Sequence, residues 1–177
     1  FNVGKVWVEG ELCADNGEYL PEMKKHSIDS VKGSVHLADF SKEKLKMKLK
    51  SNKVNVIEIL PGGVVTKKAV ATVDVDEDGD FIRNPEVDIV KVSVAERHHA
   101  LGNVANGFLA GYGIKDGAIA VTIAHDSHNI IAVGASDEDM EFAINKLAEQ
   151  EGGIVLVKDG KVIESMPMPI AGLMSDQ

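Results

Sequence analysis

The chain has 177 residues, of which 44% are hydrophobic and 27% are charged, which suits a globular protein with one main core. Its formal net charge of -9 argues against a nucleic-acid surface, and no apolar run reaches the ~18 residues of a membrane span. Cys13 is the only cysteine, which excludes a disulfide framework within one chain and, without a secretory signal pattern, predicts a cytoplasmic location.

The N-terminal region predicts a β-hairpin over residues 6–20. Asn16 and Gly17 supply its turn, because both residue types tolerate positive φ. Residues 21–52 are harder to interpret, although the alternation of apolar residues and lysine in residues 45–49 favours a strand. Because the first residue is Phe1 rather than Met, we expect a preceding segment to be missing.

β-Branched residues dominate the middle of the chain. Residues 54–60, 64–75 and 88–95 predict three strands, and the acidic residues 76–80 form a turn after the second of them. A calcium loop would need a twelve-residue spacing that ends in glutamate, which is absent here. We therefore interpret the acidic residues as a solvated hairpin turn.

The C-terminal half predicts an α+β fold with a mostly antiparallel or mixed sheet and two or three packed helices. Apolar residues at helical spacing favour one helix over residues 100–113. A second helix begins after Ser136, whose capping pattern includes Asp139, and runs to Gln150. The expected strands are residues 117–124 and 130–135, which are apolar enough to be buried on both faces, and a last hairpin formed by residues 153–157 and 162–166.

Histidine is concentrated in two segments that follow expected strands. Glu96, Arg97, His98 and His99 come after one strand, and residues 125–129 (His-Asp-Ser-His-Asn) connect two others. Because an extended chain points adjacent side chains in opposite directions, at most one of His98 and His99 is expected to face a given site.

Three interpretations of the His125–Asn129 loop remain open. His125, Asp126 and His128 could bind a divalent metal, face a substrate and transfer protons, or satisfy the backbone of the loop. A covalent mechanism at Ser127 is disfavoured because the sharp G-x-S-x-G turn is missing. We expect His125, Asp126 and His128 to lie close together at one end of the sheet.

Three blocks of the chain resemble a known family. They are residues 88–103, which include Glu96-Arg97-His98-His99; residues 115–134, which include His125-Asp126-Ser127-His128-Asn129; and Pro169-Ile170-Ala171-Gly172-Leu173-Met174-Ser175. Together they resemble the C-terminal region of microbial adenine deaminase, a member of the amidohydrolase superfamily.

The resemblance implies hydrolysis of adenine to hypoxanthine and ammonia. In that family manganese or iron is held in a (β/α)₈ barrel that precedes this region, and a metal-activated hydroxide attacks the purine. The histidine-any-histidine metal motif of the barrel is absent from this sequence, as is the cysteine signature of zinc deaminases. The resemblance thus implies an enzyme as the parent protein, no certain metal site in this chain, and no activity of the chain alone.

The resemblance also implies domains, site residues and partners. Residues 1–20 would be strands that leave the barrel region, and residues 21–177 the C-terminal domain. His125, Asp126 and His128 would have supporting catalytic roles and would be the only metal ligands if the chain held any. Substrate contacts would come from Asn129, His98, His99 and Glu96. The expected partners are the barrel of the same polypeptide and a purine, with a homo-oligomer possible and neither nucleic acid nor membrane bound.

Two other functions are compatible with the residues alone. One is a freestanding, non-catalytic module that binds a purine-like small molecule or a protein. The other is a self-contained metal hydrolase built on the His125–Asn129 loop.

Overall fold

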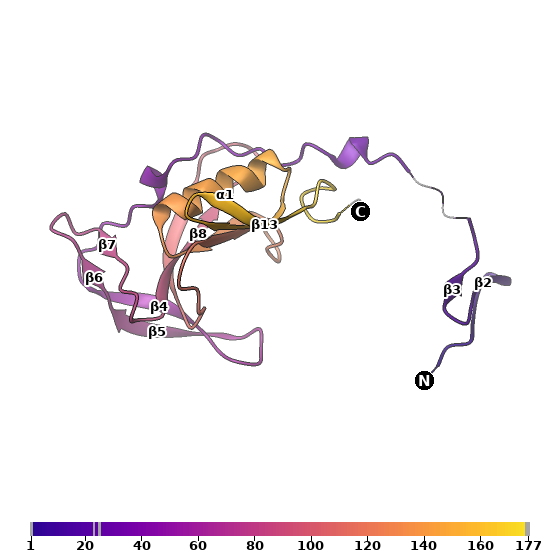
Figure 1. Ribbon diagram of the computed structural model, residues 1–177, viewed down its shortest axis with the longest axis horizontal. Coiled ribbons are helices and arrows are strands. Elements are labelled where there is room, and N and C mark those ends of the chain that lie inside the picture. Colours follow the sequence, from indigo (N-terminus) through magenta and orange to yellow (C-terminus); the bar gives the residue numbers. More distant parts are fainter. Residues whose placement is uncertain (1, 23, 25, 176–177) are drawn as a thin grey trace. The chain divides into compact units, whose positions relative to one another are not determined.

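The computed structural model describes residues 2–22, 24 and 26–175 (Figure 1). The chain divides into two compact units, Phe1–Ser30 and Val31–Gln177. The predicted domain boundary between residues 1–20 and 21–177 stays a prediction.

The first unit is a small antiparallel meander. Strand β1 (Lys5–Val8) pairs with β2 (Glu11–Asp15), which pairs with β3 (Glu18–Tyr19). Asn16 and Gly17 both have positive φ, 49° and 87°, in the turn between β2 and β3. The hairpin predicted from this Asn-Gly pair is confirmed.

The second unit is built on an eight-stranded sheet of order β13-β12-β10-β11-β8-β9-β4-β5. Neighbouring strands are antiparallel except β4 and β9, which are parallel, so the mixed sheet expected from the sequence is confirmed. The strands are β4 (Lys53–Ile59), β5 (Thr66–Thr72), β8 (Ile89–Ala95), β9 (Val104–Ala110), β10 (Ala118–Val121), β11 (Ile130–Gly134), β12 (Gly153–Lys158) and β13 (Lys161–Pro167). A separate hairpin joins β6 (Asp74–Val75) to β7 (Phe81–Ile82), and a 3-10 helix spans Lys42–Leu45. Another 3-10 helix, Asp29–Val31, contains the boundary between the two units.

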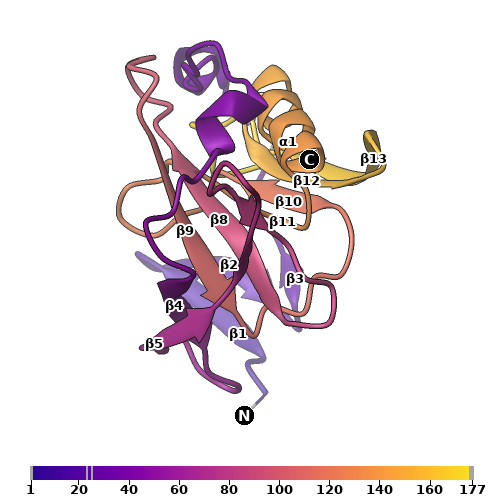
Figure 2. The same ribbon diagram turned by 90° about the vertical axis from the view of Figure 1, so that its left-hand side faces the viewer.

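Helix α1 (Asp137–Glu149) lies on one face of this sheet (Figures 1 and 2). Its N-cap is Ser136, whose hydroxyl accepts the Asp139 N–H at 3.2 Å, as the capping pattern predicted. The helix buries a stripe of apolar side chains completely: Met140, Ala143, Ile144 and Leu147. This face, together with its continuation under Phe40, Leu45 and Phe81, is called the covered face.

Small residues let α1 approach the sheet closely. Ala118, Ala120 and Ala132 are at most 3% exposed beneath it. At Gly134 a Cβ atom would lie 2.3 Å from Cγ of Met140, closer than real Cβ contacts come. The residues between these small ones point to the opposite face of the sheet.

That opposite face, the open face, is lined by larger apolar side chains. Its apolar cluster contains buried Val90, Leu109 and Val133, with Ile114 as its one member from outside the strands among the described residues. The further apolar residues that the strand alternation places on this face include Ile57, Ile59, Val70, Val92, Val94, Ala105, Ile119, Val121, Ile131, Ile154, Leu156 and Met166.

The helix predicted over residues 100–113 is wrong, and α1 is the only α-helix of the described residues, where two or three helices were expected. The segment instead contains strand β9, paired with β8 over its whole length and with β4 near its end. Val104, Asn106 and Phe108 face the covered side, while Ala105 and Leu109 face the open side. Because both faces of the sheet accept apolar residues here, the strand contains no clear alternation, and its apolar spacing happens to match a helix.

The strand predicted at residues 45–49 is also wrong. Leu45 ends a 3-10 helix, and of the following residues Lys48 alone makes an isolated bridge, to Asp80. Leu45, Met47 and Leu49 still turn to the same side and pack in the core, which explains the alternation without strand pairing. The acidic turn is confirmed, because the Asp76 carboxylate accepts the N–H groups of Asp78 and Asp80 between β6 and β7.

Candidate functional site

The two histidine segments meet at one end of the large sheet. Ala95, the last residue of β8, pairs with Ile130, the first of β11. The loop after β8 and the loop before β11 therefore leave the sheet side by side. The Nε2 atom of His98 lies 2.8 Å from the carbonyl oxygen of Ser127, which joins the two loops directly. Proximity of His98 to the His125–Asn129 loop was expected, and the structure brings them together.

Glu96 shapes the first loop. Its carboxylate accepts hydrogen bonds from the backbone N–H groups of Leu101, His99 and His98. These bonds, with Leu101 making the largest contribution, hold the pKa of Glu96 below its ordinary value of 4.5. Both carboxylate oxygens are thus engaged by the loop itself, and the predicted contact of Glu96 with substrate stays a prediction.

Arg97, in the first loop, is buried and hydrogen-bonds to the backbone of the second loop. Its side chain is 2% exposed, and burial lowers the pKa of its guanidinium. Among the described residues its hydrogen-bond acceptors are all backbone carbonyl oxygens: His128 at 2.6 Å, and Ser34 and Ala171 at 3.2 Å. The guanidinium therefore joins three segments that are far apart in the sequence.

The C-terminal segment closes around the same guanidinium. Gly172 has a φ of 72°, and a Cβ atom there would lie 2.8 Å from Nη1 of Arg97. The carbonyl oxygen of Gly172 accepts a hydrogen bond from the hydroxyl of Thr122, a buried residue that lies just before the His125–Asn129 loop in the sequence. All three blocks that carry the family resemblance consequently converge on Arg97.

The His125–Asn129 loop is tightly turned. The His128 N–H donates to the carbonyl oxygen of Ala124 at 2.7 Å, and Asp126 and His128 have positive φ, 71° and 47°. Positive φ is uncommon for residues other than glycine, although aspartate and histidine adopt it more readily than most. The bond from Arg97 to the His128 carbonyl holds the second of these two residues in place.

The side chains of this loop divide into two groups. His125 and Asp126 point outward, 97% and 90% exposed, with Nδ1 of His125 3.4 Å from Oδ1 of Asp126. In contrast, Nδ1 of His128 and Oδ1 of Asn129 are buried without a hydrogen-bond partner within the described part of the chain. The loop thus presents one histidine and one carboxylate, while His128 turns inward.

The described residues do not form a metal site. Nowhere among them do three histidine, cysteine, aspartate or glutamate side chains come together as ligands would. His98 and His99 lie with ring centroids 6.4 Å apart, but no third ligand completes a set with them in this part of the chain. Manganese or iron therefore does not fit the residues that the structure describes.

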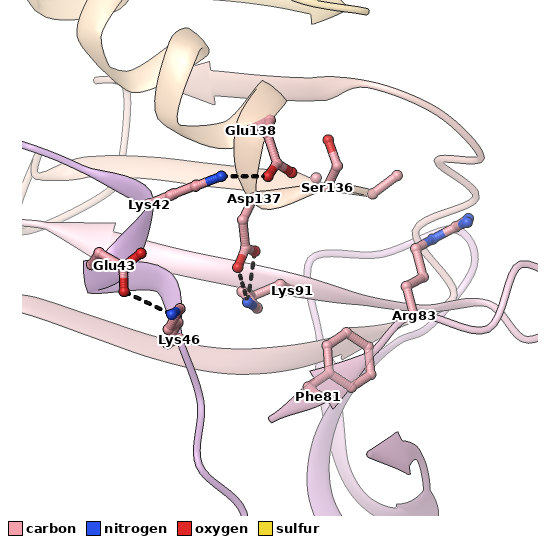
Figure 3. Close-up of a pocket in the computed structure, with 11 residues that line it drawn as sticks. Lys42, Glu43, Lys46, Phe81, Arg83, Lys91, Ser136, Asp137 and Glu138 are labelled. Carbon is pink, nitrogen blue, oxygen red and sulfur yellow. Dashed lines mark hydrogen bonds and ion pairs between the residues drawn. The ribbon is translucent and has the colours of Figure 1, made fainter. Parts of the chain in front are cut away.

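A separate polar cavity of about 400 Å³ lies beside the start of α1 (Figure 3). Its lysines are paired with carboxylates: Lys91 with Asp137 at 2.6 Å, Lys42 with Glu138 at 2.8 Å, and Lys46 with Glu43 at 2.8 Å. Its arginine, Arg83, donates to the carbonyl oxygen of Ile114 instead. The hydrogen bond and charge of Glu138 raise the pKa of Lys42. None of the predicted site residues lines this cavity, and its ion pairs connect α1 to the sheet and to the Lys42–Leu45 turn.

Sequence reasoning missed the role of Arg97. It identified the neighbouring Glu96 and His98 but not the residue between them that holds the site together. The available signal was an arginine two residues after the end of a strand of mainly apolar residues, since a charged residue so close to a buried strand is itself buried only with several partners.

Comparison with known proteins identifies the family of this chain. The chain belongs to the adenine deaminase C-terminal domain family, whose model matches residues 63–177. It is 56% identical to adenine deaminase 2 of Desulfotalea psychrophila over 99% of the chain and 30% of that relative. It is 50% identical to adenine deaminase of Ligilactobacillus salivarius, over 98% of the chain and 30% of the relative. The chain thus spans about 30% of the length of these curated relatives, and the family resemblance seen in the sequence is confirmed.

None of the helices in the described residues is long and apolar enough to cross a membrane.

Proposed function

We propose that this chain serves as the C-terminal domain of an adenine deaminase polypeptide that hydrolyses adenine to hypoxanthine and ammonia. The relatives that match nearly the whole chain are named adenine deaminases, and the match covers about 30% of each of them. Because the described residues do not form a metal site, the proposal places manganese or iron outside this chain, in the barrel that the resemblance implies.

The observation that carries a functional role is the support of the His125–Asn129 loop by Arg97. The guanidinium of buried Arg97 donates to the backbone of this loop, and His98 of the neighbouring loop contacts the loop's Ser127 carbonyl. These contacts hold the backbone from which the exposed His125 and Asp126 side chains project. We propose that these two side chains reach the mouth of the active site of the whole enzyme.

The proposed chemistry uses ordinary properties of these groups. The exposed groups are an imidazole, whose ring nitrogens can donate or accept a proton, and an adjacent carboxylate that can orient the ring. The pair can therefore accept or donate a proton at the purine or at the departing ammonia. Asn129, His98 and His99 would contact the purine from the same end of the sheet, whereas His128, which turns inward, would support the loop.

The experiment is steady-state kinetics of the full adenine deaminase polypeptide that carries this sequence, followed by the absorbance change from adenine to hypoxanthine. His125→Ala and Asp126→Asn should lower kcat/KM by about tenfold to a thousandfold, the range for loss of a positioned proton-transfer group. Lys161→Ala, at an exposed position in the last hairpin, is the matched control and should retain activity. Activity equal to that of the parent in both loop variants would leave the loop a structural role only.

The same assay on the 177-residue chain tests the competing self-contained hydrolase. We expect no turnover with added manganese or iron, because the described residues provide no ligand set. Turnover by the chain alone that His125→Ala abolishes would refute the proposal and favour a hydrolase built on this loop.

A further inference from the structure

The two faces of the large sheet differ in side-chain size. On the covered face, α1 packs on Ala118, Ala120, Ala132 and Gly134. On the open face, the adjacent positions of the same two strands are Ile119, Val121, Ile131 and Val133. The larger apolar side chains therefore lie on the side without a helix.

In β8 the polar side chains lie on the covered face and the apolar side chains on the open face. Lys91 and Ser93 are buried on the covered face, whereas Val90, Val92 and Val94 line the open face. A sheet with one solvated side normally alternates in the opposite sense, with polar residues toward water. The open face has the composition of an interior layer.

This apolar surface is incompletely covered within the second unit. Ile114 packs against its centre, where Val90, Leu109 and Val133 are buried. Toward the β13 edge the face is uncovered: Met166 is 50% exposed and Leu156 39%, and the paired residues next to them, Ile154, Val121 and Ile131, are half-buried. Contiguous exposed apolar patches of this kind mark interaction surfaces. The open-face positions of the central strands β8, β9, β10 and β11 include no charged residue, although the chain carries a net charge of -9. Depletion of charge at the centre of a surface is typical of a permanent interface.

We propose that the open face is the surface on which the rest of the adenine deaminase polypeptide packs, an inference that rests on the proposed function. About 30% of each relative is matched by this chain, so most of the polypeptide is available to cover the face. A separate protein is usually guided to its binding surface by charges, which the centre of this face does not have. A covalently linked partner does not need such guidance, because it is already present at millimolar effective concentration.

The location of the face also supports this occupant. Val94 and Ile131 are paired on the open face at the end of the sheet from which both histidine loops emerge. Val94 comes two residues before Glu96, and Ile131 two residues after Asn129. A layer packed on the open face would therefore border the loop that presents His125 and Asp126.

Cysteine labelling tests the inference. In a Cys13→Ser background, Leu156→Cys and Met166→Cys place a thiol at partly exposed open-face positions. Ser165→Cys is the matched control, because it neighbours Met166 on β13, is exposed and points to the opposite side of the strand. Maleimide modification at each introduced cysteine is followed by peptide mass spectrometry, in the chain alone and in the full polypeptide.

All three cysteines should react in the chain alone. In the full polypeptide, labelling of Leu156→Cys and Met166→Cys should slow by at least about tenfold, whereas that of Ser165→Cys should not change. Equal labelling of the open-face cysteines in both proteins would overturn the inference. Protection in the chain alone, with the mass of a dimer by light scattering, would also overturn it and assign the face to a second copy.

The adenine assay on the same full polypeptide separates this inference from the proposed function. Protection of the open face without deamination would refute the function and leave the docking surface in place. Deamination without protection would refute the docking surface alone.

Discussion

Replacement of Arg97 by methionine should destabilise the domain more than other single substitutions at this end of the sheet. Methionine keeps the apolar part of the side chain but leaves the carbonyl groups of His128, Ser34 and Ala171 without their charged donor. Each buried acceptor that loses its partner costs about 1–3 kcal/mol, so the three together give a loss of about 3–6 kcal/mol, allowing for partial access of water. Because small domains are stable by only about 5–15 kcal/mol, this loss is a large fraction of the total.

Urea unfolding of the chain, followed by far-UV circular dichroism, measures this loss. Arg97→Lys keeps the charge and can retain one of the three bonds, so its loss should fall between those of the parent and the methionine variant. Lys161→Met, at an exposed site, should change stability by less than about 0.5 kcal/mol. A loss below about 1 kcal/mol for Arg97→Met would refute the view that this guanidinium holds the three segments together.

Two further predictions concern packing and pH. Gly134→Ala should lower the free energy of unfolding by about 1–3 kcal/mol, because its Cβ atom would lie 2.3 Å from Cγ of Met140. Thermal unfolding midpoints would show this loss. Gly107→Ala is the control and should be tolerated, because the nearest contact of its Cβ atom would be 3.7 Å away. Since the folded-state pKa of Glu96 is lowered from 4.5, its stabilising contribution is present above that pH and is lost as the pH falls through the lowered pKa. Glu96→Gln should therefore reduce stability near neutral pH and weaken its decline in acid, and parallel pH profiles of the urea midpoint for variant and parent would contradict this.

Helices and hairpins whose ends and type are indicated by residues close together in the sequence could be predicted. Helix α1 has a capping serine, acidic residues in its first turn and a regular apolar stripe, so its position follows from periodicity and capping alone. The last hairpin follows from its Asp159-Gly160 turn between two β-rich runs. In both cases the partners lie close in sequence.

The remaining features depend on pairing between distant segments. Strand β9 is fixed by contacts with β8 and β4 rather than by its own propensity, and its many small residues are compatible with a helix. Likewise, the sequence places His98 and Ser127 in separate loops, and only the register of β8 against β11 brings them to 2.8 Å. Arg97 could not be recognised for the same reason, because two of its three acceptors are more than sixty residues away in the chain.

The small side chains beneath α1 set the limits within which this domain can vary. Larger side chains do not fit at Ala118, Ala120 and Ala132. Substitution at these positions is therefore restricted whether or not another layer covers the open face of the sheet. The residues that alternate with them, such as Ile119 and Ile131, can change size in the chain alone at much lower cost. A variant library selected for folding of the chain, and a second selected for deamination by the whole polypeptide, should therefore agree beneath the helix and diverge on the other side. The positions that differ between the two selections would outline the buried contact residue by residue.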